Sequence, residues 1–146
     1  MSIFRKLLAT NASAAVILVR LIVGAVFFSE GIQKFLYPEA LGVGRFTKIG
    51  IPAPEVMAPF VGGCEIVCGV LFLLGLLTRF AAVTMIINML VAISTTKVSI
   101  LLNEGFWKMA HETRTDWAML LGSLFLLIVG AGAWSADAII CRKGEA

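Results

Sequence analysis

The chain has 146 residues, of which 60% are hydrophobic and 14% are charged, with a net charge of +3. A soluble globular domain is nearer half apolar and a quarter charged, so this composition excludes an ordinary soluble fold and indicates an integral membrane protein. The basic residues lie at the ends of apolar runs and form no basic stretch, so we expect contact with the lipid bilayer and no binding to nucleic acid.

Four apolar runs predict four transmembrane helices. A helix needs ~20 mostly apolar residues to cross a ~30 Å hydrocarbon layer, and long runs without strict alternation favour helices over strands. The third run is long enough only if its polar stretch, Ser94 to Lys97, lies near an interface. We therefore predict an all-α four-helix bundle that forms one domain over residues 1–146. The spans are expected at about 14–32, 56–77, 80–102 and 117–134.

The N-terminal segment also admits a second interpretation, a cleaved signal peptide. Arg5 and Lys6 precede an apolar stretch, as in the positively charged region of such a peptide. Arg20 interrupts that stretch, however, and a small-residue cleavage site is missing. We therefore expect an uncleaved first transmembrane helix.

The connections differ greatly in length. Helices 1 and 2 are joined by an extended loop, whose first part, residues 38–50, is a candidate for a short interfacial helix beginning at Pro38. A solvated loop is an equally acceptable interpretation of this stretch. The proline-rich part at residues 51–59 is not expected to form regular helix. Helices 2 and 3 are joined by a tight turn at residues 77–79, and a polar loop at 103–116 is expected before helix 4.

Four spans would place both termini on the same side of the membrane. Lysine and arginine are nearly balanced between the two sides, so their totals do not decide the orientation. Their placement favours one side, because basic clusters flank the outer helices directly and Arg79 lies in the shortest turn. We expect the end segments, residues 1–10 and 142–146, to lie in the cytoplasm.

Charged residues within the apolar runs are the main candidates for a site. On helix 1, Arg20 shares one face with Gly24, Gly31 and Lys34, and on helix 2 Glu65 lies between two glycines of a matching stripe. Small residues on both stripes would let the two backbones approach closely. We therefore predict a buried ion pair between Arg20 and Glu65.

This pair has two interpretations that the sequence leaves open. It either lines a cavity for a small molecule, with Glu65 as a proton-handling carboxylate, or it only fixes the register of two helices. Lys34, Asn88 and Asp116 are candidates for the outer rim of such a cavity. Asn88 alone is equally well explained as an interhelical hydrogen-bond residue, and Asp116 as a partner of a helix dipole.

Metal and haem sites are not predicted. His111 is the sole histidine, so two histidines of one chain cannot ligate a haem, and no zinc-ligand spacing surrounds it. Cys64 and Cys68 are four residues apart and do not form the C-x-x-C motif of dithiol enzymes. Together with Cys141 they are expected to be small buried side chains, although the two near Glu65 keep a redox role open.

These residues together resemble the DoxX family of small, four-helix bacterial membrane proteins. Helix 1 resembles the family through R-x3-G-x6-G-x2-K, which begins at Arg20, and the following loop ends in G-I-P at Gly50–Pro52. Helix 2 and the start of helix 3 match G-x-x-E-x3-G-x5-G-x2-T-R-x-A-A, which begins at Gly62. The remaining matches are an acidic residue opening helix 4, Asp116, and a closing S-x-D, Ser135 and Asp137.

The resemblance implies a location in the bacterial cytoplasmic (inner) membrane and two functions of different classes. The first is a membrane subunit of a quinone-linked oxidoreductase or redox-stress complex, which binds a lipophilic molecule within the bundle and works with a partner subunit. The second is a non-enzymatic interaction or assembly protein whose buried charges serve helix packing. The chain contains no self-sufficient catalytic motif, and the sequence does not decide its oligomeric state, substrate or electron donor.

Overall fold

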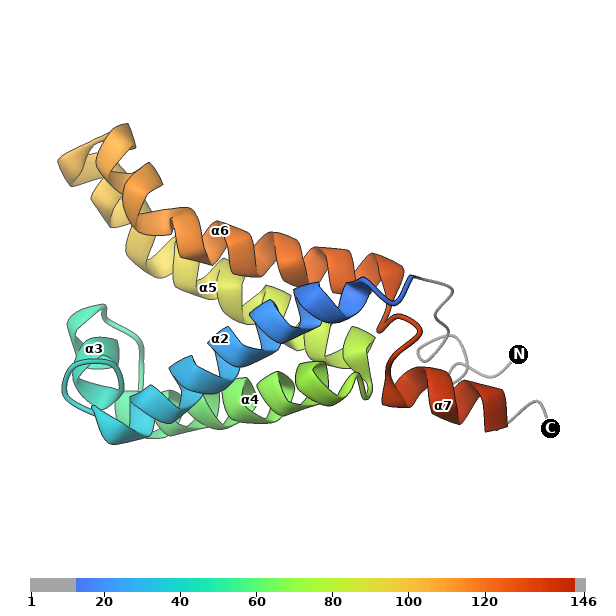
Figure 1. Ribbon diagram of the computed structural model, residues 1–146. Coiled ribbons are helices and arrows are strands. Elements are labelled where there is room, and N and C mark those ends of the chain that lie inside the picture. Colours follow the sequence, from blue (N-terminus) through green and yellow to red (C-terminus); the bar gives the residue numbers. More distant parts are fainter. Residues whose placement is uncertain (1–12, 144–146) are drawn as a thin grey trace.

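The computed structural model describes residues 13–143 and is helical, with no strand among these residues (Figure 1). Of the end segments predicted to be cytoplasmic, residues 1–10 and 144–146 lie outside the described residues. The helices are α2 (Val16–Leu36), α3 (Val43–Lys48), α4 (Pro54–Leu74), α5 (Thr78–Glu104), α6 (Phe106–Val129) and α7 (Ala136–Lys143).

Three of the described helices, α2, α4 and α5, are long and apolar enough to cross a membrane. The expected spans at 14–32, 56–77 and 80–102 therefore correspond to real helices, with ends shifted by two to four residues. Helix α6 differs from its predicted span at both ends. It ends at Val129 because Gly130 adopts a positive φ of 85°, which ends the helix before Trp134.

The polar loop expected at residues 103–116 is wrong for most of its length. The chain turns at Gly105, where φ is +87°, and helix α6 begins at Phe106. The polar composition of this segment suggests a loop. In the helix, however, Glu112 and Asp116 face a cavity and Thr113 is buried, so these polar side chains lie inside the molecule.

The proline-rich stretch at residues 51–59 is also more regular than expected. Helix α4 begins at Pro54. A proline is tolerated there because the N–H groups of the first turn have no intrahelical acceptor, so the missing N–H of proline costs no hydrogen bond. Pro59 lies inside the helix without ending it. Within the 38–50 segment a short helix does occur, but α3 begins at Val43, after turns that follow Pro38.

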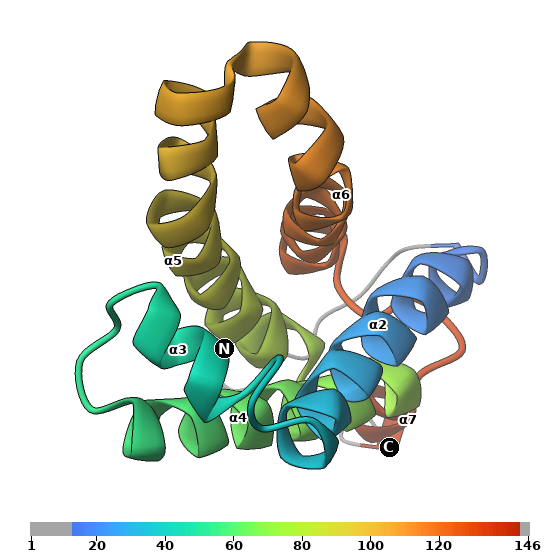
Figure 2. The same ribbon diagram turned by 90° about the vertical axis from the view of Figure 1, so that its left-hand side faces the viewer.

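The long helices are arranged as two pairs, α2 with α4 and α5 with α6 (Figures 1 and 2). Within the first pair the backbones come very close. A Cβ added to Gly31 would lie 2.6 Å from the carbonyl oxygen of Gly62, and one added to Gly69 would lie 2.7 Å from the nitrogen of Phe28. This confirms the close approach that the two glycine stripes predict.

The two pairs meet at the end of the molecule that holds the described chain ends and diverge toward the other end (Figure 1). Where they meet, side chains of all four helices form the apolar core, which includes Phe27, Phe72, Met85 and Leu126. Where they diverge, α3 and the turn between α5 and α6 stand apart. The space between them contains the candidate site.

Candidate functional site: a polar cavity between the helix pairs

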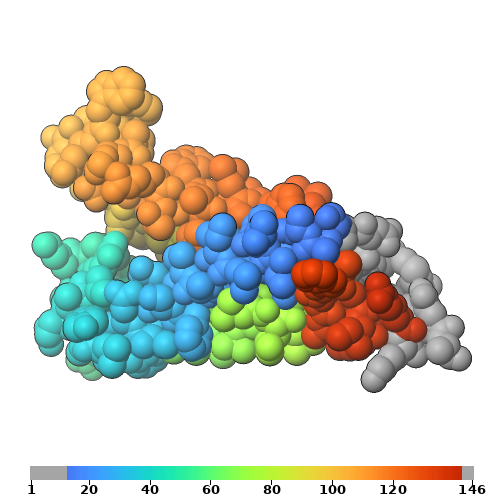
Figure 3. Space-filling model, in the orientation of Figure 1, coloured from blue at the N-terminus to red at the C-terminus, as the bar shows by residue number. Residues whose placement is uncertain are grey.

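A cavity of about 640 Å³ lies between the diverging pairs and is lined by residues of α2, α3, α4, α5 and α6. The space-filling view shows a hollow between α3, in teal, and the orange end of α6 (Figure 3). This volume falls within the range of small-molecule sites in proteins. The cavity opens at the end of the molecule opposite the chain ends.

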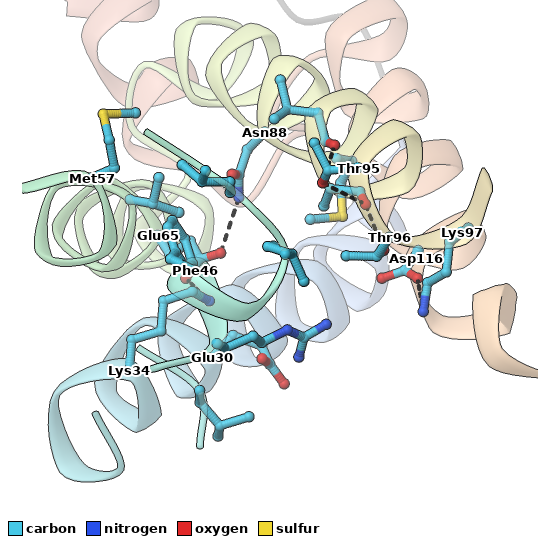
Figure 4. A pocket seen from close by; sticks show the side chains of 18 of the residues that line it. Glu30, Lys34, Phe46, Met57, Glu65, Asn88, Thr95, Thr96, Lys97 and Asp116 are labelled. Carbon is cyan, nitrogen blue, oxygen red and sulfur yellow. Dashed lines mark hydrogen bonds and ion pairs between the residues drawn. The ribbon is translucent and has the colours of Figure 1, made fainter. Parts of the chain in front are cut away.

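Glu65 is the best-connected carboxylate of the cavity (Figure 4). It is 3% exposed, and each of its oxygens has a partner on a different helix. Lys34 Nζ on α2 lies 2.6 Å from Oε2, and Asn88 Nδ2 on α5 donates to Oε1 at 3.0 Å. One carboxylate therefore links three helices across the point where the pairs diverge.

A second ion pair lies on the wall formed by α5 and α6. Lys97 Nζ is 3.1 Å from Asp116 Oδ2, and it also donates to the carbonyl oxygen of Glu112 at 2.9 Å (Figure 4). These contacts join the polar halves of α5 and α6. Asp116 therefore does more than complement a helix dipole, because it lies in the middle of α6 and not at its start.

The rest of the lining mixes apolar side chains with three threonines and the charged residues Glu30 and Arg45. It includes two phenylalanines and three methionines, which give a flexible and polarizable surface. These residues are Phe27, Phe46, Met57, Met89 and Met119. A cavity with both apolar walls and many polar groups can hold a molecule that has an apolar part and several hydrogen-bonding atoms.

The structure does not form the predicted ion pair between Arg20 and Glu65. The guanidinium of Arg20 is buried among backbone carbonyl oxygens at the opposite end of the molecule. Nε donates to Phe72 O at 2.9 Å, and Nη2 donates to Leu73 O at 3.0 Å. Nη1 donates to Ala131 O at 2.9 Å and Trp134 O at 2.6 Å.

This correction has a clear physical reason. Helix α4 ends at Leu74, so the carbonyl groups of its last turn lack their regular helical donors. The guanidinium fork donates to two of them at once, to Leu73 O and to Phe72 O, which also accepts from the N–H of Gly75. Arg20 therefore closes the end of α4 and holds the segment after α6. It does not line the cavity, whereas Lys34, Glu65, Asn88 and Asp116 do.

Two further charged residues bind backbone groups at the same end. Asp137 accepts hydrogen bonds from the N–H groups of Leu77 and Thr78, at 2.8 and 3.1 Å, and so caps the start of α5. Arg79 donates to the carbonyl oxygens of Leu127 and Ile128 near the end of α6. We call Arg20, Arg79 and Asp137 the terminal clamp. The sequence analysis matched these residues to a family pattern without assigning them this role.

Burial raises the pKa of Asp137, and the two backbone N–H groups and the charge of Arg20 act in the opposite direction. Asp137 is 1% exposed and belongs to α7, which lies outside the spanning helices. These hydrogen bonds and the charge of Arg20 therefore stabilise an ionisable side chain that is buried where three helices meet.

The remaining candidates take no part in the cavity. His111 is exposed, and its Nδ1 lies 3.1 Å from Arg114 Nη1. All three cysteines are free, with Cys68 buried in the core. Among residues 13–143, no group of three or more His, Cys, Asp or Glu side chains is arranged to hold a metal ion.

Comparison with known proteins identifies the family. The DoxX family model matches residues 15–98, more than half of the chain. The chain is 52% identical over 147 residues to "Uncharacterized membrane protein Rv3486" of Mycobacterium tuberculosis, an alignment that covers 97% of this chain and 90% of the relative. It is 31% identical over 126 residues to "Putative oxidoreductase CatD" of Bacillus subtilis, covering 86% and 87% of the two chains. No solved structure matches the chain. This protein therefore belongs to the DoxX family of integral membrane proteins.

Proposed function

We propose that this protein is a membrane subunit of a quinone-linked oxidoreductase or redox-stress complex, and that it binds a quinone in the cavity. The observation that carries the proposal is the position of Glu65, a buried carboxylate held between Lys34 and Asn88 at a cavity of ligand size. The relative named "Putative oxidoreductase CatD" supports the reaction class.

The polar groups of the cavity match what a quinone needs. A quinone ring carries two carbonyl oxygens that accept hydrogen bonds, and Lys34 and Asn88 are N–H donors. Reduction to the quinol consumes two electrons and two protons. Glu65 would exchange these protons, because a carboxyl group hydrogen-bonded to an ammonium and an amide can release and accept one. The electrons would come from a redox group on a partner subunit.

The apolar groups would hold the rest of the molecule. The phenylalanine and methionine side chains form flat, polarizable walls for the ring. The separation of the two helix pairs offers a lateral path by which a lipid-soluble tail would reach the bilayer. A water-soluble substrate would have less use for such a lining.

The proposal includes a topology. Helix α6 runs back along α5 to the end where the chain begins, which supports its role as a fourth span although its own composition does not identify it as one (Figure 1). With the basic residues placed as described, both termini would face the cytoplasm of a bacterial inner membrane. All four spans would belong to one domain.

The site can be tested with a photoreactive azidoquinone and the protein purified in detergent. We expect crosslinks on α2, α4 and α5 within the cavity, and their loss when excess unlabelled quinone is added. Asn88→Leu should raise the Kd for quinone about tenfold, since it removes one buried donor worth ~1.4 kcal/mol.

Asn103→Leu is the matched control, because Asn103 is on the same helix, is exposed and does not line the cavity. Its Kd should equal that of the unaltered protein. Labelling outside the cavity, or an equal Kd for both leucine variants, would exclude quinone binding at this site.

A non-enzymatic assembly protein is the second candidate. One observation favours it: the charges of the cavity are paired without any ligand, and each ion pair lies within a packed helix pair, Lys34–Glu65 between α2 and α4 and Lys97–Asp116 between α5 and α6. This candidate predicts that no quinone binds, while loss of Lys97 or Asp116 separates α5 from α6. Absence of specific azidoquinone labelling would leave it as the better explanation.

A further inference from the structure

The turn between α5 and α6 presents large apolar side chains where a loop facing water would present polar ones. We call residues 101–109 the tip. Leu102 is 78% exposed, Phe106 is 58% exposed and Trp107 is 83% exposed. The two aromatic rings contact each other edge to face, with centroids 5.3 Å apart. The tip stands apart from α3 and from the rest of the molecule (Figures 1 and 2).

The length of α5 fixes the depth of the tip in the membrane. The helix has 27 residues, so it is ~40 Å long, or ~38 Å along the membrane normal at a ~20° tilt. The hydrocarbon layer is ~30 Å thick, and the two headgroup layers bring the bilayer to ~40–45 Å. If α5 begins at one edge of the hydrocarbon, its last residue lies ~8 Å past the other edge. Each headgroup layer is ~5–7.5 Å thick, so the end of α5 reaches the outer edge of the headgroup layer.

The tip also continues a surface that already faces lipid. Along α5 the exposed apolar side chains run from the first turn to Leu102 without interruption by an exposed charge. These residues are Phe80, Val83, Ile87, Leu90, Val91, Val98, Leu101 and Leu102. Three exposed residues, Asn103, Glu104 and Gly105, separate Leu102 from Phe106 and Trp107. Lys108 comes next, with half of its side chain exposed and its ammonium 3.5 Å from Glu112.

We propose that the tip inserts into the headgroup layer of the leaflet opposite the chain termini, with Phe106 and Trp107 as its anchors. Tryptophan is enriched at this depth because its ring is apolar and its N–H reaches polar groups. Lys108 can extend its ammonium toward lipid phosphates. The occupant of this surface is therefore lipid, and the inference holds whether or not the cavity binds a quinone.

The test uses Trp107 as its own reporter. Trp117→Phe and Trp134→Phe leave one tryptophan, and both positions are partly or largely exposed, so these changes should be tolerated. The protein is reconstituted in vesicles of phosphatidylcholine and phosphatidylglycerol. We expect the emission of Trp107 to be shifted to the blue of tryptophan in water, with iodide quenching reduced several-fold. Lipids brominated near the headgroup should quench it more than lipids brominated near the chain ends.

A second variant tests the insertion of the tip without fluorescence. Trp107→Ser with Phe106→Ser should leave the Tm in detergent unchanged, because both side chains are mostly exposed. The same change should make the tip accessible to a water-soluble protease in vesicles. Emission and iodide quenching equal to those of free tryptophan would overturn the proposal and indicate that the tip projects into water for a soluble partner. Stronger quenching by the deep brominated lipids would overturn it as well.

Discussion

The two ends of this molecule use buried charges in different ways. In the terminal clamp, Arg20 and Asp137 bind backbone groups at helix ends, where the regular helical hydrogen bonds stop. At the cavity, Lys34 and Glu65 bind each other and face open space. A charge that satisfies backbone groups is fixed by the fold, whereas one held by another side chain can exchange that partner for a ligand. Charges that bind backbone groups at helix ends are therefore regarded as structural, and charges paired at a cavity as candidates for ligand binding.

The largest effect is expected from the clamp. Arg20→Met removes four hydrogen bonds to carbonyl oxygens, of which those to Phe72 and Ala131 are buried and those to Leu73 and Trp134 are partly buried. We expect a loss of about 3–5 kcal/mol in the free energy of unfolding, measured by denaturant titration in detergent micelles. Arg20→Lys keeps the charge without the planar fork and should recover only part of this loss. Equal stability of Arg20→Met and the parent protein would remove the distinction between the two ends.

The cavity pair should tolerate change better, provided both partners change. Lys34→Met leaves Glu65 without its cation and should cost about 1–3 kcal/mol. The double variant Lys34→Met with Glu65→Gln should regain most of that stability, since neither charge is then left alone. Thermal unfolding of the three variants gives the coupling between the two residues. A double variant as unstable as the sum of the single ones would show that the pair is not a unit.

The smallest effect is expected from the cap of α5. Asp137→Ala removes the acceptor of the Leu77 and Thr78 N–H groups and should cost about 1–2 kcal/mol. Asp137→Asn retains an acceptor oxygen and serves as the control, with a smaller loss. Amide hydrogen exchange at Leu77 and Thr78 should rise in the alanine variant first. Unchanged exchange there would mean that the cap does not hold the start of α5.

The sequence predicts the elements that depend on local periodicity and fails where partners come from far along the chain. The stripe through Arg20, Gly24 and Gly31 is buried as expected, because helical phase alone determines it. The predicted partner of Arg20 is wrong because the prediction pairs it with a side chain. Its actual acceptors are backbone carbonyl groups at the end of α4 and just after the end of α6. Where those helices end depends on Gly75 and Gly130, whose backbone angles the apolar pattern does not reveal.

The candidate site shows the same division. Glu65, Lys34, Asn88 and Asp116 were selected as charged or polar residues in apolar surroundings, and all four line the cavity. The pairing of Lys34 with Glu65 was missed because helical phase placed Arg20 opposite Glu65 as its partner. The cavity itself was beyond prediction in detail, since it exists only because the two helix pairs diverge.

The reach of Arg20 has a consequence for how the protein is made. Two acceptors of its guanidinium, the carbonyl oxygens of Ala131 and Trp134, follow Arg20 in the chain by 111 and 114 residues. Synthesis proceeds from the N-terminus, so α2 enters the bilayer long before those carbonyl groups leave the ribosome. Until then a cation at membrane depth has only part of its final shell. In a chain that stops before residue 131, the guanidinium would have only the carbonyl oxygens of Phe72 and Leu73 among its four acceptors.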